Sequence, residues 1–168
     1  MTEQSAYLFH QTPPALCIDL MNHLNISLED KLYEPFRGEG GFYNAFPALN
    51  EKDWSEIRQG RNYSDYTGEY DWVITNPPFR LDVGTKRVNS FWFLLDYYAT
   101  RAKKGIAFLG NDRCLSSLTP NRLMTLNNRG WYIQKIIVCA VKKWRGRYFF
   151  IIFEKKPNDI YQCLKNNY

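Results

Sequence analysis

The fold is decided by the stretch Asp71-Trp72-Val73-Ile74-Thr75-Asn76-Pro77-Pro78-Phe79, in which an apolar run ends in two prolines. The run from residue 72 to residue 75 is β-branched and aromatic, which predicts a buried strand. Two adjacent prolines fix φ twice and bias the residues before them toward extended conformations. The strand is therefore expected to stop at Asn76, in a rigid loop.

A second strand-loop-helix pattern lies upstream of this stretch. Residues 31–34 predict a short strand, which runs into the Gly-rich loop 35–41 and then into a brief helix from Phe42 that Pro47 ends. Before it, the prolines after Thr12 and apolar residues at helical spacing predict a first helix. Between the loop and residue 70, the one strand-like stretch is Trp54–Ile57.

The downstream half alternates in the same way. We expect a helix at 89–101, a buried strand at 105–109 and a helix at 120–127 that closes near Gly130. Residues 133–141 and 148–153 predict an antiparallel hairpin with a basic tip. Strands alternating with helices indicate a three-layer, Rossmann-like α/β sheet, mostly parallel, with this hairpin at its C-terminal edge. In such a sheet, ligands bind beyond the carboxyl ends of the strands.

Composition limits the class of protein. The 168 residues show neither repeat nor linker, and their 45% hydrophobic content predicts one packed domain over residues 1–168. The net charge of +5 and the pI near 9.0 suit an anionic partner such as nucleic acid. A metal site is not expected, because no metal-binding spacing occurs among Cys17, Cys114, Cys139, Cys163, His10 and His23. The N-terminus shows no leader and no apolar run could span a bilayer, so we expect a cytoplasmic protein that does not bind a membrane.

The Gly-rich loop has the features of a ligand-binding turn. Gly38 and Gly40 let a ligand approach the backbone, and the helix that follows offers free amide donors. An isolated Gly-x-Gly is also an ordinary turn. Glu34, at the end of the preceding strand, could accept a hydrogen bond from an ammonium or hydroxyl group. The loop therefore predicts a ligand that resembles a nucleotide or an amino acid.

A second acidic residue is expected to meet ribose hydroxyls about 20 residues beyond such a loop. Glu51, Asp53 and Glu56 are the candidates, and Glu56 is favoured because it lies in the only strand-like stretch nearby. The alternative is that all three are solvated loop charges. Asn62 and Tyr63 could bind and cover an adenine ring, although an ordinary polar turn explains them nearly as well.

The loop from Asn76 to Phe79 carries the chemistry. It offers an amide oxygen, backbone carbonyls beside two prolines that have no N–H, and an aromatic face. Together these suit an amino group on a planar ring such as adenine. Two acceptors that hold the two amino hydrogens would favour a tetrahedral nitrogen in the transition state. Phe79 would stack on the base after the base has flipped out of a duplex.

Together these motifs resemble the adenine-specific DNA methyltransferases with an Asn-Pro-Pro-aromatic motif, and the resemblance spans nearly the whole chain. It implies S-adenosylmethionine as cofactor and a seven-stranded sheet with a reversed last hairpin. Asn76, Pro77, Pro78 and Phe79 match the catalytic tetrapeptide. The cofactor site it implies consists of Gln11, Thr12, Pro13, Glu34, Pro35, Phe36, Gly38 and Gly40. Three departures are Glu34 in place of the commoner Asp, Asn62 where Asp is frequent, and a short interval before Asn76.

Several alternatives stay open for the substrate. Structured RNA and a protein glutamine also present planar amino or amide groups, and a non-catalytic nucleic-acid-binding subunit would keep the same fold. DNA is the substrate that the resemblance implies. Basic residues near the catalytic loop and in the hairpin tip favour a phosphate backbone over a protein, although a solvated hairpin tip is the alternative; they are Lys86, Arg87, Lys142, Lys143, Arg145 and Arg147. Since no segment is long enough for a separate target-recognition domain, specificity would come from short loops, from a homodimer or from a separate specificity subunit, or would be low.

Overall fold

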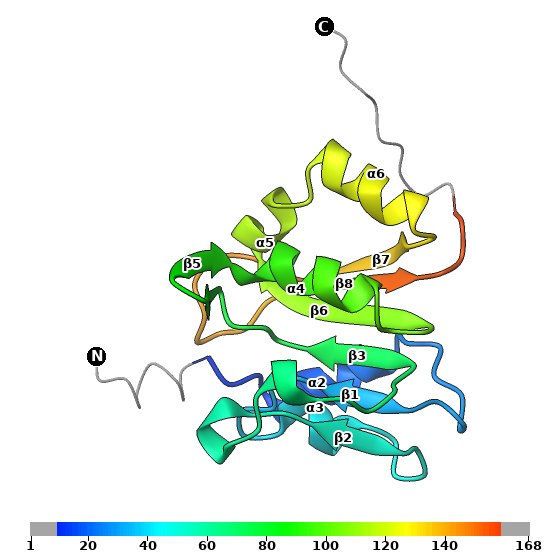
Figure 1. Cartoon of the computed structure of the whole chain (residues 1–168). Coiled ribbons are helices and arrows are strands. Elements are labelled where there is room, and N and C mark those ends of the chain that lie inside the picture. The colour runs from blue at the N-terminus through cyan, green and yellow to red at the C-terminus, as the bar shows by residue number, and fades with distance from the viewer. Residues whose placement is uncertain (1–9, 159–168) are drawn as a thin grey trace, which may run out of the picture.

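A six-stranded sheet forms the centre of the structure, a computed structural model that describes residues 10–158 (Figure 1). Its order is β2-β1-β3-β6-β8-β7. The strands are β1 (Leu32–Glu34), β2 (Lys52–Trp54), β3 (Trp72–Thr75), β6 (Gly105–Asn111), β7 (Tyr132–Cys139) and β8 (Tyr148–Glu154). The first four in this order run parallel, whereas β8 is antiparallel to both β6 and β7. The mostly parallel sheet with an antiparallel C-terminal hairpin confirms the predicted fold class.

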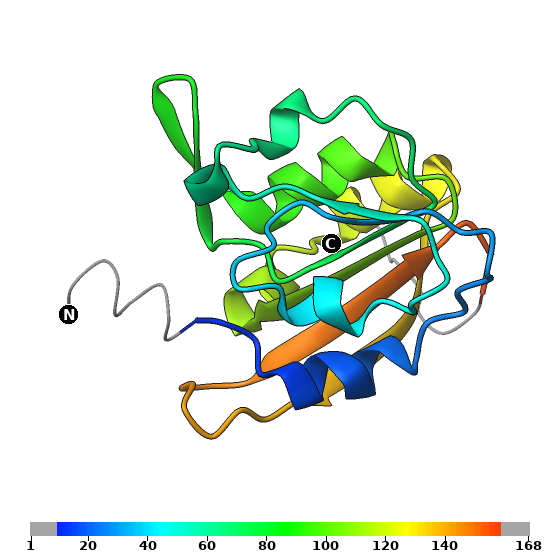
Figure 2. The same cartoon turned by 90° about the horizontal axis from the view of Figure 1, so that it is seen from below.

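Helices cover both faces of the sheet (Figure 2). Helices α2 (Pro14–Met21) and α3 (Gly41–Ala45) pack on one face, and α4 (Ser90–Ala99) and α6 (Pro120–Asn128) pack on the other. Alternate residues of β6 point to opposite layers, so that Ile106 and Phe108 join the core under α4 while Ala107 and Leu109 join the core under α2. Both faces of the central strands are therefore buried, as a parallel sheet requires.

Local signals account for most of the helix boundaries. Pro14 occupies the first turn of α2, where the missing N–H costs nothing. Asn89 caps α4, since its Oδ1 accepts a hydrogen bond from the amide of Phe91 at 3.1 Å. Gly130, with φ +82°, follows the end of α6. The predicted helices and the C-terminal hairpin are confirmed, with ends that differ by a few residues.

Two predictions about the edge of the sheet are wrong. The strand predicted at Trp54–Ile57 lies earlier, at Lys52–Trp54, because the Glu56 carboxylate accepts from the amide of Arg58 and starts the 3₁₀ turn Ile57–Gln59. The sheet of residues 10–158 also has six strands rather than seven. The short interval before β3 holds two 3₁₀ turns, the second being Tyr63–Asp65, in place of another strand.

Sequence analysis missed a hairpin and a short helix. Strands β4 (Arg80–Val83) and β5 (Lys86–Asn89) form a two-stranded hairpin that stands out from the body of the protein (Figure 2). Helix α5 (Asp112–Ser116) follows β6 directly. Val83 pairs with Lys86, and Gly84 has φ +59°, so a Gly-x dipeptide between two short alternating runs was the available signal.

Some predictions fall outside the described residues, namely those for Cys163 and for residues 1–9. Within residues 10–158, no helix has the length and apolar character that a membrane crossing needs.

Candidate active site

The Gly-rich loop and the Asn-Pro-Pro-Phe loop meet at one edge of the sheet. Both follow parallel neighbours, β1 and β3, so their carboxyl ends point the same way. Between them lies a pocket of about 520 Å³, which we call the Gly-loop pocket. Its lining residues are His10, Gln11, Thr12, Glu34, Phe36, Arg37, Gly38, Gly41, Phe42, Glu56, Ile57, Arg58, Asn76, Pro77, Pro78, Phe79, Arg87, Trp144 and Tyr148.

A glycine is needed at position 38 because the segment that carries Gln11 lies very close to the Gly-rich loop there. It has φ +53°, and a Cβ built on it would collide with the side-chain amide of Gln11. The same Gln11 Oε1 accepts a hydrogen bond from the amide of Glu39 at 2.9 Å. The segment before α2 therefore lies directly on the Gly-rich loop, and it forms one wall of the pocket.

Two buried carboxylates lie at the base of this loop. Glu34 is 2% exposed and accepts from the amide of Tyr43 at 2.6 Å, and Glu56 is 7% exposed and accepts from the amide of Gly38 at 2.8 Å. Burial raises the pKa of Glu34 well above its ordinary value, and the nearby Glu56 raises it further. The Tyr43 amide and Arg37 act in the opposite direction. A cationic group of a ligand would lower the pKa of Glu34, as Arg37 does, and so favour its ionised form.

The side chain of Asn76 is held in place by its amide nitrogen. Nδ2 donates to Thr12 Oγ1 at 3.2 Å and to the carbonyl of His10 at 3.4 Å. Because Nδ2 is engaged on that side, the Oδ1 atom is the part of the amide that remains to accept from a ligand. Phe79 is 38% exposed and its ring lies 5.5 Å from the His10 ring, edge to face.

Ser90 fixes the remainder of the loop from the first turn of α4. Its hydroxyl donates to the carbonyl of Pro78, and its amide donates to the carbonyl of Phe79 at 3.4 Å. Within residues 10–158 the structure shows no donor to the carbonyl of Pro77. The loop thus offers two acceptors side by side along the chain, the Asn76 Oδ1 atom and the Pro77 carbonyl.

Comparison with known proteins concerns the fold. No family model and no curated protein matches the sequence. Among solved structures, a Listeria monocytogenes protein assigned to the class I S-adenosylmethionine-dependent methyltransferases is 12% identical, with a TM-score of 0.64. The match covers 92% of this chain and 64% of that protein. The fold is that of the class I methyltransferases.

Two further class I folds with known complexes match at similar levels. Magnesium protoporphyrin IX methyltransferase from Synechocystis, solved with bound S-adenosylhomocysteine, is 10% identical with a TM-score of 0.59, over 89% of this chain and 84% of that one. A chain of the E. cuniculi Mtq2–Trm112 complex is 16% identical with a TM-score of 0.58, over 89% of this chain and 99% of that one. That complex is responsible for methylation of the termination factor eRF1.

On this methyltransferase fold, the predicted cofactor residues divide into two groups. Those that line the pocket are Gln11, Thr12, Glu34, Phe36, Gly38 and Glu56, and those that do not are Pro13, Pro35, Gly40, Asn62 and Tyr63. Asn62 instead caps the second 3₁₀ turn, where its side chain accepts from the amide of Ser64. Tyr63 lies behind the pocket, with its ring 5.1 Å from that of Phe36.

The predicted nucleic-acid residues lie close to the same pocket. Lys86 and Arg87 are exposed on β5, and Arg87 lines the pocket. The connection between β7 and β8 carries four exposed basic residues, Lys142, Lys143, Arg145 and Arg147. Arg147 is paired with Asp112 at 3.1 Å. Trp144, in the same connection, lines the pocket. Burial lowers the pKa of His10, and Lys143 lowers it further.

Sequence reasoning missed several lining residues of this site. Trp144, in the basic connection, is buried with its ring 4.5 Å from that of Tyr148, and both line the pocket. An aromatic residue between basic ones was the available signal. Arg37, His10 and Ser90 were also missed, because their roles depend on contacts distant in sequence.

In the described part of the chain, His, Cys, Asp and Glu form no group of three that could hold a metal ion.

Proposed function

We propose that this protein transfers a methyl group from S-adenosylmethionine to the 6-amino group of adenine in DNA. The observation that carries the proposal is the shared pocket, which is lined both by the Asn-Pro-Pro-Phe loop and by the Gly-rich loop with its buried carboxylate. The fold supports methyl transfer, and the net charge of +5 supports a nucleic-acid substrate.

The residues of the pocket fit this cofactor. A volume of about 520 Å³ lies in the ordinary range for small-molecule sites. Glu34 and Arg37 supply opposite charges, which match the ammonium and carboxylate groups of the methionine part. The absence of a Cβ at Gly38 lets the backbone approach the ligand. When bound, S-adenosylmethionine supplies a methyl group on a positively charged sulfur, which is open to attack by a nucleophile.

The chain's own part in the reaction is to hold the amino group. Asn76 Oδ1 and the Pro77 carbonyl would each accept one amino hydrogen, which frees the nitrogen lone pair from the ring. These bonds strengthen as the nitrogen becomes tetrahedral, so they stabilise the transition state more than the ground state. The new N–C bond forms as the S–C bond breaks, and the nitrogen then loses one proton to solvent. Phe79 would stack on the flipped base.

A second candidate substrate is a protein glutamine, whose carboxamide also presents a planar NH₂ group. The specific observation in its favour is the match to a chain of the Mtq2–Trm112 complex, whose target eRF1 is a protein. RNA remains the third substrate for the same chemistry. The exposed arginines beside Phe79 favour a phosphate backbone over a protein.

Transfer of tritium from labelled S-adenosylmethionine tests the proposal. Duplex DNA, single-stranded DNA, total RNA and protein extract are offered separately, and the DNA product is hydrolysed and assayed for N6-methyladenine by mass spectrometry. We expect label in DNA with the parent protein and none with Asn76→Ala, which controls for a methyltransferase from the expression host. Label in protein alone would exclude the proposed substrate.

A further inference from the structure

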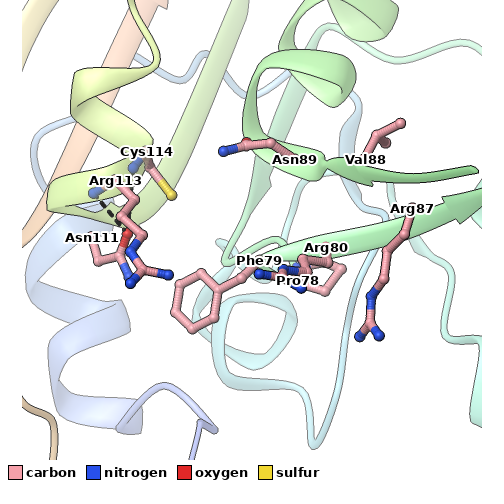
Figure 3. Close-up of a pocket in the computed structure, with 9 residues that line it drawn as sticks. All are labelled: Pro78, Phe79, Arg80, Arg87, Val88, Asn89, Asn111, Arg113 and Cys114. Atoms are coloured by element: carbon pink, nitrogen blue, oxygen red, sulfur yellow. Dashed lines mark hydrogen bonds between the residues drawn. The ribbon is translucent and has the colours of Figure 1, made fainter.

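A second hollow lies on the other side of Phe79 (Figure 3). We call it the hairpin pocket, because it opens between the β4–β5 hairpin and α5. Its volume is about 890 Å³, and it is lined by Pro78, Phe79, Arg80, Arg87, Val88, Asn89, Asn111, Arg113 and Cys114. Three residues, Pro78, Phe79 and Arg87, line this pocket and the Gly-loop pocket alike. The end of the catalytic loop is therefore the wall between the two.

The charge in the hairpin pocket is of one sign. Arg80, Arg87 and Arg113 are all exposed, and none of the described residues that line it is acidic. Among these three arginines, Arg87 pairs through Nε with Asp82 Oδ1 at 4.0 Å, and because both side chains are mostly exposed, this pair neutralises little of the charge. Figure 3 shows the ring of Phe79 projecting between Arg113 and the hairpin that carries Arg80 and Arg87.

The two asparagines bring further donors to this pocket. Asn89 Oδ1 accepts from the amide of Phe91 at 3.1 Å. Asn111 Oδ1 accepts from the amides of Arg113 and Cys114 at 3.1 and 3.3 Å. The oxygen of each side chain is thus already engaged by its own helix start, and the NH₂ group is the part left for a ligand. With the three guanidinium groups, the polar side chains of the pocket supply mainly donors.

We propose that the hairpin pocket binds the nucleotide next to the methylated adenine, with Arg80 and Arg113 on its flanking phosphates and the asparagine NH₂ groups on the acceptors of its base. This inference rests on the proposed function and names the part of the substrate that the second pocket holds. It assigns to the β4–β5 hairpin and α5 the contacts that a separate target-recognition domain would otherwise make.

A pocket rich in donors and without a carboxylate favours a nucleic acid over a peptide. Phosphate oxygens accept without donating, and base edges such as the O6 and N7 atoms of guanine accept as well. A peptide presents as many backbone donors as acceptors, and none of the described lining residues has a carboxylate to accept from its N–H groups. Arginine also binds phosphate through two parallel N–H···O bonds, which adds geometric selectivity.

Binding of labelled oligonucleotides tests this assignment. The probe is a fluorescein-labelled single strand with one central adenine. Its matched partner carries uncharged methylphosphonate linkages on both sides of that adenine and on the far side of each neighbouring nucleotide. The test variant is Arg80→Ala with Arg113→Ala. The control is Arg129→Ala, which removes one arginine charge away from the pocket, at the end of α6, where Arg129 pairs with Asp96. Fluorescence anisotropy at several salt concentrations gives Kd and its salt dependence.

We expect the double variant to bind the phosphate probe more weakly than the Arg129→Ala control. The slope of log K against log salt should fall by roughly 1.4 units, about 0.7 for each phosphate contact on a single strand. The uncharged probe should show little change between variants. Equal losses on both probes, or a loss no larger than the control's, would overturn the inference. It would also be overturned if a glutamine-containing peptide competed with the probe and unlabelled oligonucleotide did not.

Turnover separates this inference from the proposed function. The double variant should raise KM for the oligonucleotide more than it lowers kcat, because Arg80 and Arg113 contact the phosphates while the contacts to the amino group are intact. A parent protein that binds the probe through both arginines and yet methylates only protein would refute the proposed function and leave the phosphate site standing. If the parent methylates DNA but the double variant binds the probe as tightly as the parent does, the phosphate site is refuted and the proposed function stands.

Discussion

The two pockets that meet at Phe79 differ in the kind of ligand charge that they accommodate. The Gly-loop pocket combines two buried carboxylates, Glu34 and Glu56, with the arginines Arg37, Arg58 and Arg87, whereas the hairpin pocket has three arginines and no acidic residue among the described residues that line it. The first suits a ligand that carries both a cationic and an anionic group, and the second suits an anion. Methyl transfer from a sulfonium to a nucleic acid needs both, on opposite sides of one amino-group acceptor. That acceptor, Asn76, lines the Gly-loop pocket and lies two residues before Pro78, the first residue shared by the two pockets.

The largest effect on turnover is expected from substitution of Asn76. Asn76→Ala removes the Oδ1 acceptor and leaves the prolines that shape the loop, so folding and cofactor binding should be kept. Loss of one oriented transition-state hydrogen bond should lower turnover at least about 100-fold, or ~2.7 kcal/mol. Thr12→Val is the graded control, because it removes only one of the two bonds that hold the Asn76 amide. Single-turnover rates and cofactor titration measure the two properties, and near-normal turnover of Asn76→Ala would mean that the active site lies elsewhere.

Glu34 should determine affinity on the cofactor side. Glu34→Gln keeps the shape of the side chain and the acceptor for the Tyr43 amide, and it removes the negative charge. Leaving a buried cation unpaired costs ~2 kcal/mol or more, so Kd for S-adenosylmethionine should rise roughly 30-fold or more. Glu39→Gln, on an exposed residue of the same loop, should leave Kd unchanged. Calorimetric titration distinguishes the two, and equal affinities would exclude a role for the Glu34 charge.

The same residue predicts a pH dependence. The pKa of Glu34 is raised by burial, so a cationic ligand must displace a proton from it at pH values below that pKa. Cofactor affinity should therefore rise with pH up to the raised pKa and then level off. The stability of the protein should change in the opposite sense, falling as pH increases from the ordinary value of 4.5 through the raised pKa. Glu34→Gln should flatten both profiles in calorimetry and thermal unfolding, and parallel profiles in the two proteins would contradict this.

The smallest effects are expected in the basic connection between β7 and β8. Arg145→Ala should weaken duplex binding similarly across sequences and lower the salt slope by about one unit, as for one lost phosphate contact. Arg147→Ala should lower it less, because Asp112 already neutralises part of that charge. Anisotropy with duplexes of unrelated sequence measures both. An unchanged slope for Arg145→Ala would assign this connection to solubility rather than to binding.

The sequence alone predicted the strand ends and tight turns, because these depend on residues that are neighbours in the chain. The β-branched run before Asn76, the prolines after it and the Gly-rich loop after Glu34 specify strand ends and tight turns locally, so the fold class and the meeting of the two loops followed from them. The prediction failed at Glu56, where a side-chain hydrogen bond to the amide of Arg58 replaced a strand by a 3₁₀ turn. Local propensity does not include such a bond.

Tertiary structure alone decided which groups are left to bind a ligand. The Pro77 carbonyl differs from its neighbours only because Ser90 takes those of Pro78 and Phe79. The amide of Asn76 is oriented by Thr12, which lies 64 residues away in the chain. Likewise, Arg80 and Arg113 come from elements that pack on either side of Phe79. Which donors and acceptors are already bonded, and which charges share a pocket, depends on segments that are far apart in the chain. The sequence pattern shows only which groups each segment contains.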